Sequence, residues 1–146
     1  MQNLFRAVSP LLLSSVLTLF ACSQQKSASP PATHAEPEAI ARTEFTDRIE
    51  NYFEYEPLHA GKPSQVRIHL TDLSDGSPVE KAEVKLFVRP KGSTEAVVET
   101  TARVGKVTGI YVAELNVPRS GFYDVEFRIK NTKLDERLPV SDFKVE

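Results

Sequence analysis

The residues best suited to bind a metal ion are three histidines, His34, His59 and His69. Asp72 and Asp75 follow His69 closely and could add carboxylate oxygens. A transition-metal site needs several nitrogen or sulfur ligands that converge on the ion, and no His-x-His or His-x3-His spacing is present. We therefore expect no metal site and no cofactor, and we regard His69, His59 and Asp72 as weak candidates.

No pattern typical of an enzyme occurs in the sequence. The only cysteine is Cys22, and neither a Gly-x-Ser-x-Gly turn nor a glycine-rich phosphate loop is present. Serine, histidine and aspartate all occur, but nothing in their spacing orders them into a triad. Asp135 and Glu136 stand between Lys133 and Arg137, as in a solvated turn. We expect a non-enzymatic protein.

One aromatic side chain is a candidate for contact with a partner protein. Phe87 lies between Lys85 and Arg89, on the otherwise polar face of a predicted strand. β-Sandwich domains bind partners through their end loops or through exposed strand edges. An exposed Phe87 would suit such a contact. The alternative is that an N-terminal strand or the preceding linker covers it.

The elements that must position these residues are strands. Apolar and polar residues alternate in segments 64–71, 82–89 and 121–130, which is the pattern of half-buried antiparallel strands. The alternation places ten side chains inward: Val66, Ile68, Leu70, Val84, Leu86, Val88, Tyr123, Val125, Phe127 and Ile129.

Weaker strand candidates complete the pattern, and turn-forming clusters separate all of these segments. The weaker candidates are 48–55, 95–104, 109–117 and 138–146. About seven strands in about 100 residues predict an all-β fold, an immunoglobulin-like antiparallel β-sandwich. Tyr123 lies near the start of the penultimate strand, where such sandwiches place a corner tyrosine; alternatively it only packs in the core.

The composition fits one globular domain and gives no reason to expect a nucleic-acid partner. The 146 residues include 18 Lys and Arg against 20 Asp and Glu, a formal net charge of −2. Nucleic-acid-binding proteins usually carry a basic surface. A single cysteine also excludes an internal disulfide framework.

The N-terminus has the features of a secretion signal. A short segment with Arg6 precedes an apolar stretch over 7–21, which is shorter than the ~20 residues of a membrane-spanning helix. Leu19-Phe20-Ala21-Cys22 resembles the lipobox of bacterial lipoproteins, although Phe20 replaces the usual small residue. The resemblance implies that residues 1–21 are a lipoprotein signal peptide and that Cys22 is triacylated. The alternative is an ordinary secretory signal followed by a chance cysteine.

Residues 22–43 are predicted to be a flexible tether, and residues 44–146 a single folded domain. The tether segment lacks aromatic residues and is rich in Ser, Gln, Ala and Pro, so it cannot bury enough apolar surface to fold. Ser-Gln-Gln after Cys22 lacks the aspartate typical of inner-membrane retention. The expected location is the bacterial cell envelope, with the protein lipid-anchored in the outer membrane and facing the periplasm.

A family resemblance covers most of 45–146. The segment 45–88 is similar to the N-terminal β-domain of heavy-metal-type RND efflux periplasmic adaptors, and the later V-T-G-I-Y and S-G-F-Y-D-V segments are similar to the same domain and to the YtkA-like domain. The matching residues are Pro57, Leu58, Gly61, Ser64, His69, Leu70, Thr71, Asp72, Leu73, Pro78 and Val79.

The resemblance implies an interaction module that contacts components of a metal or small-molecule efflux system. Complete adaptors continue into a barrel, a lipoyl-like domain and a helical hairpin, so we expect either a stand-alone accessory lipoprotein or the first piece of a split adaptor. The alternative is a periplasmic metal- or ligand-binding lipoprotein that buffers or delivers ions.

Overall fold

The computed structural model describes residues 38–146, which form eight strands and no helix. The predicted all-β fold is therefore confirmed for this part of the chain. Nothing within it could cross a membrane as an apolar helix. The strands are β1 (Ile40–Phe45), β2 (Ile49–Tyr55), β3 (Pro63–Asp72), β4 (Glu83–Pro90), β5 (Val98–Val104), β6 (Ile110–Asn116), β7 (Gly121–Lys130) and β8 (Asp135–Val145).

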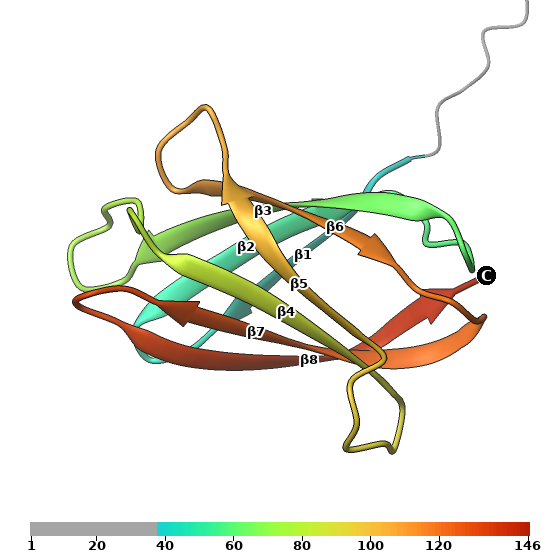
Figure 1. Cartoon of the computed structure of the whole chain (residues 1–146). Helices are drawn as coiled ribbons and strands as arrows, with labels where there is room; N and C mark the ends of the chain where they lie inside the picture. Colours follow the sequence, from blue (N-terminus) through green and yellow to red (C-terminus); the bar gives the residue numbers. More distant parts are fainter. Residues whose placement is uncertain (1–37) are drawn as a thin grey trace, which may run out of the picture. The chain divides into compact units, whose positions relative to one another are not determined.

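All eight strands belong to one antiparallel sheet in the order β1-β2-β3-β6-β5-β4-β7-β8 (Figure 1). This sheet has two halves, β1-β2-β3-β6 and β5-β4-β7-β8, and β5 joins them. Residues 98–102 of β5 pair with β4, whereas only Arg103 and Val104 pair with β6. The two edge strands also meet, since Arg42 of β1 donates a hydrogen bond of 2.7 Å to the carbonyl oxygen of Ser141 in β8. The sheet is thus nearly closed.

The core lies between the two halves of the sheet. All ten side chains that the alternation placed inward are buried, which confirms that part of the prediction. Aromatic rings connect the halves: Phe53 of β2 lies 5.0 Å from Phe127 of β7 and 5.9 Å from Phe143 of β8, between ring centroids. The Tyr123 hydroxyl donates a 2.8 Å hydrogen bond to the carbonyl of Arg119, as expected of a corner tyrosine.

The first strand was not predicted. β1 includes residues 40–43, which were predicted to belong to the tether, so the paired part of the chain begins earlier than residue 44. Its sequence Ile-Ala-Arg-Thr-Glu-Phe has no apolar alternation, because two of its three inward residues are charged. The inward residues are Ile40, Arg42 and Glu44, which pair with Tyr55, Phe53 and Asn51 of β2.

Arg42 links β1 to the core, and its removal should destabilise the domain. Its guanidinium carbon lies 5.3 Å from the Phe143 ring centroid and 5.9 Å from that of Phe53. We expect Arg42→Ala to lower the free energy of unfolding by about 1–2 kcal/mol, because it removes these cation–π contacts and the hydrogen bond to Ser141. Chemical denaturation measures the change, with Arg119→Ala on an exposed turn as the control. Equal losses in the two variants would contradict this role.

Asn51 is the one buried polar residue among those described, and its replacement should stabilise the domain. The residue is 0% exposed, and neither atom of its side-chain amide has a hydrogen-bond partner. Burial of an unpaired amide opposes folding, so Asn51→Val should raise the free energy of unfolding by about 1–2 kcal/mol. Thermal unfolding followed by circular dichroism tests this expectation. A lower melting temperature would show that the amide has a structural role.

Candidate functional site

The predicted contact residue Phe87 lies at the centre of the outer face formed by β5, β4, β7 and β8. Its ring is half-buried, and the Arg128 guanidinium lies over it, 4.0 Å from the ring centroid. Arg89 is 5.8 Å from the same centroid. Phe87 is therefore covered by two arginines of its own face, neither freely exposed nor placed under the N-terminal strand. An aromatic ring beneath guanidinium groups is a typical cation–π arrangement.

One carboxylate fixes these arginines in place. Glu126 lies directly opposite Phe87 in the pairing of β4 with β7. Its carboxylate is 3.5 Å from Arg89 and also forms an ion pair with Arg128. The Arg89 and Glu126 side chains are only 20% and 19% exposed. A network held in this way is already organised before any partner arrives, which reduces the entropy lost on binding.

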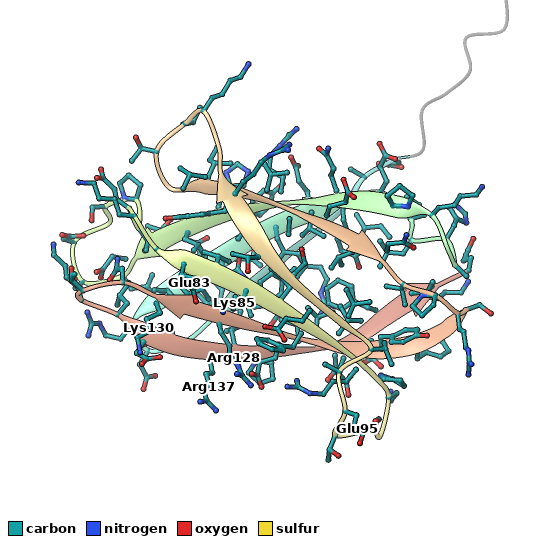
Figure 2. All side chains as sticks on the ribbon, viewed as in Figure 1. Glu83, Lys85, Glu95, Arg128, Lys130 and Arg137 are labelled. Atoms are coloured by element: carbon teal, nitrogen blue, oxygen red, sulfur yellow. The ribbon has the colours of Figure 1, made fainter. Side chains whose placement is uncertain are left out.

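Beside Phe87, a row of three cations crosses the strands. Lys85 is the register partner of Arg128, and Arg128 is the register partner of Arg137. Figure 2 shows these side chains on β4, β7 and β8. Neighbouring strands lie about 4.8 Å apart, and like charges placed opposite each other destabilise a sheet. Glu83 relieves part of this repulsion through a 3.2 Å ion pair with Lys85. The carboxylates of Glu83, Glu99 and Asp135 lie among these cations, so the face keeps a small excess of positive charge.

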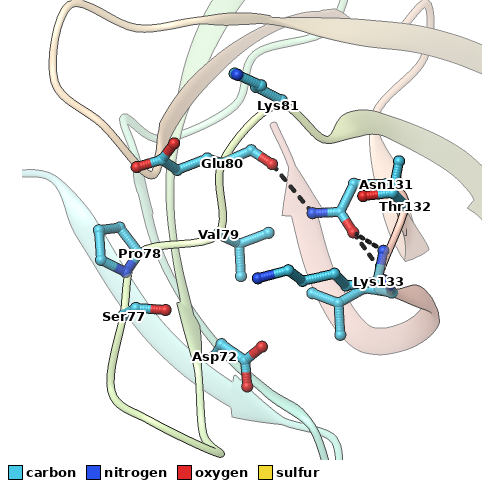
Figure 3. Close-up of a pocket in the computed structure, with 10 residues that line it drawn as sticks. Asp72, Ser77, Pro78, Val79, Glu80, Lys81, Asn131, Thr132 and Lys133 are labelled. Carbon is cyan, nitrogen blue, oxygen red and sulfur yellow. Dashed lines mark hydrogen bonds between the residues drawn. The ribbon is translucent and has the colours of Figure 1, made fainter.

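A hollow of about 370 Å³ lies at one end of the domain, between the β3–β4 loop and the β7–β8 turn (Figure 3). The Asn131 side chain spans the gap, since it donates to the Glu80 carbonyl and accepts from the backbone N–H groups of Lys133 and Leu134. Its lining mixes carboxylates and amines with the apolar Val79 and Leu134, without a set of like ligands. The hollow therefore has no evident chemistry of its own.

The weak metal-ligand candidates do not come together. His59 is exposed in the loop after β2, whereas His69 lies on β3 with its ring 5.2 Å from that of Tyr52. Asp72 accepts hydrogen bonds from the backbone N–H and the hydroxyl of Ser74, and these bonds lower the pKa of its carboxyl group. Residues 38–146 contain no group of three or more His, Cys, Asp or Glu side chains that could hold a metal ion. Cys22 and His34 lie outside the described residues.

Glu126 and Arg128 were not predicted from the sequence to be partners of Phe87. The alternation on β7 does place both residues on the outer face. Their position beside Phe87, however, depends on the register between β4 and β7, which are more than thirty residues apart in the chain. No local sequence signal specifies that register.

Comparison of the chain with protein-family models, with curated proteins and with solved structures finds no match.

Proposed function

We propose that this chain is a non-enzymatic interaction module of the bacterial cell envelope, anchored by an acylated Cys22 in the outer membrane and facing the periplasm. The sequence up to Cys22 supports the anchor, because its sole cysteine follows a short apolar segment and a lipobox-like tetrapeptide. Several acyl chains on one residue give stable membrane attachment. The residues after Cys22 act as a spacer that lets the domain reach a partner.

We further propose that the domain is an immunoglobulin-like sandwich. Two observations support this assignment. β5 has only two residues paired with β6, so the sheet divides into β1-β2-β3-β6 and β5-β4-β7-β8 with the core between them. The hydrogen bond from the Tyr123 hydroxyl to the Arg119 carbonyl is the contact of a tyrosine corner.

The observation that carries the proposed function is the outer face around Phe87. It combines a half-buried aromatic ring, arginines held by Glu126 and the cation row Lys85, Arg128 and Arg137. Aromatic and arginine side chains contribute most to protein–protein interfaces. This face suits a protein partner with acidic side chains near an apolar one.

The partner that the family resemblance favours is a component of a metal or small-molecule efflux system. In this role the chain is an accessory protein or the first part of a split adaptor. It brings its Phe87 face to the efflux complex and performs no chemistry itself.

A substitution on this face should have the same effect on growth as deletion of the whole protein. We expect a deletion strain to become more sensitive to metal salts or to small toxic compounds, and Phe87→Ala in place of the native residue to give the same sensitivity. Phe45→Ala is the matched control, because Phe45 is 60% exposed on β1 of the other half of the sheet. Growth inhibition across a panel of such compounds measures the effect. If the deletion strain grows like the parent on every compound, the efflux proposal is wrong.

A further inference from the structure

A second surface, where the end of β5 meets β6 and β3, differs in character from the Phe87 face. It is an open hollow of about 610 Å³ beside the β5–β6 hairpin, which projects from the sheet in Figure 1. Its volume lies in the range of small-molecule sites, about 300–1,000 Å³. The residues that line it are Gln65, Arg67, His69, Arg103, Val104, Gly105, Lys106, Val107, Ile110 and Val112.

Aliphatic side chains form much of this hollow. Val104 and Val107 are 63% and 61% exposed, which is unusual for valine. Ile110 and Val112 are half-buried on the outer face of β6 and extend the apolar surface between the hairpin and β3. Together with Val107, which is on the hairpin, Ile110 and Val112 make the larger part of the hollow's surface apolar.

The charges around the hollow have one sign. Arg67, Arg103 and Lys106 line it, and no aspartate or glutamate does. Each of four other hollows in residues 38–146 has at least one carboxylate in its lining. Within those residues Arg67 pairs with Glu54 at 2.7 Å, whereas no ion pair involves Arg103 or Lys106. Two cations thus stand beside an apolar surface with their charge uncompensated by a direct ion pair.

A third feature is an unpaired ring nitrogen. Nε2 of His69 is buried and has no hydrogen-bond partner in the part of the chain that the structure describes. The Tyr52 and His69 rings pack in a T-shaped arrangement. His69 therefore lines the hollow without offering this nitrogen to a ligand, and the polar contacts come from the cations at its rim.

The hairpin that forms one wall is held in a defined conformation. The Gly105 N–H donates to the Ile110 carbonyl at 2.7 Å, and the Gly109 carbonyl accepts from Leu70 of β3 at 3.0 Å. Gly109 has a φ of 78°, and a Cβ there would lie 2.5 Å from Cβ of Pro78. Such fixed loops bind with a smaller loss of entropy than mobile ones.

From these observations we infer that the hollow binds an amphipathic anion, a carboxylate or phosphate attached to an aliphatic chain. The chain lies against Val107, Ile110 and Val112, while Arg103 and Lys106 bind the anionic group. Charge-assisted hydrogen bonds from these two side chains supply the preference for an anion. The inference is independent of the function proposed for the Phe87 face, because Lys85, Phe87, Arg128 and Arg137 lie on β4, β7 and β8 and none of them lines the hollow.

Methyl chemical shifts in NMR spectra of the unacylated mature chain, residues 22–146 with Cys22→Ser, test this inference. The probes are octanoate and octyl phosphate, with 1-octanol as the chain without a charge and inorganic phosphate as the charge without a chain. We expect saturable shifts of the hollow's valine and isoleucine methyls with both amphipathic anions. Affinity for octanol and for inorganic phosphate should be at least about tenfold weaker.

Two double variants complete the experiment. Arg103→Gln with Lys106→Gln should weaken octanoate binding about tenfold or more, whereas Lys85→Gln with Arg137→Gln, on β4 and β8 outside the hollow, should leave it unchanged. Lysophosphatidylglycerol, titrated below its micelle concentration, distinguishes a phospholipid source from a free fatty acid by its relative affinity. The inference would be overturned if octanol and octanoate bound equally or if the shifts never saturated. It would also be overturned if the variant with Arg103→Gln and Lys106→Gln bound octanoate as tightly as the parent protein.

Discussion

Phe53→Ala is expected to lower the free energy of unfolding by about 3–5 kcal/mol, the largest loss that we anticipate for a single side chain. Phe53 is 0% exposed and packs against Phe127, Phe143 and Tyr55, so it joins β2 to β7 and β8 across the core. Removing its ring leaves a cavity that neighbouring strands cannot close. It also removes one of the two rings beneath the Arg42 guanidinium.

Urea denaturation of the purified domain measures this loss. Phe53→Leu should cost less than Phe53→Ala, because leucine refills much of the cavity. Phe45→Ala is the matched control; this ring is 60% exposed, so the expected change is below about 0.5 kcal/mol. A similar small change for Phe53→Ala would mean that the two halves of the sheet do not share this aromatic core.

Cys22→Ser is expected to abolish membrane attachment completely. In the proposed lipoprotein the apolar segment over 7–21 is removed as part of the signal peptide, so the acyl chains on Cys22 are the membrane anchor of the mature protein. The serine variant should therefore appear in the soluble periplasmic fraction. Its mass should lack the diacylglycerol and amide-linked acyl groups of the parent protein.

Cell fractionation and intact-mass measurement of both proteins test this prediction. Ser23→Ala is the matched control, because it changes the adjacent residue and keeps the cysteine. Retention of the Cys22→Ser protein in membranes after a high-salt wash, with an unchanged mass, would refute the lipoprotein assignment.

The sequence was most informative where residues alternate strictly. The predicted inward residues of β3 and β4 are buried: Val66, Ile68, Leu70, Val84, Leu86 and Val88. In a sheet with a single buried face, alternate residues of a strand lie on that face, so strict alternation identifies them. β1 shows the opposite case. Arg42 and Glu44 point inward there, because a strand at the edge of the sheet can extend long side chains past the rim of the core to solvent.

The Phe87 surface could be predicted only in part. Its position on the polar face of a strand follows from alternation, and the structure agrees. What covers it does not follow, because Arg128 and Glu126 reach Phe87 through the pairing of β4 with β7. Side-chain pairs across strands depend on register, which is set by long-range packing and turn geometry. The same limit applies to the row of Lys85, Arg128 and Arg137.

The most direct test of the proposed interaction is photo-crosslinking in cells. A photoreactive phenylalanine derivative at position 87 keeps an aromatic ring on the outer face of β4, and the same derivative at position 45 is the control on β1. We predict an adduct from position 87 with a protein of an efflux system, identified by mass spectrometry, and none with that protein from position 45. Absence of any adduct from position 87, or identical adducts from both positions, would contradict the proposal that the Phe87 face is the site of interaction.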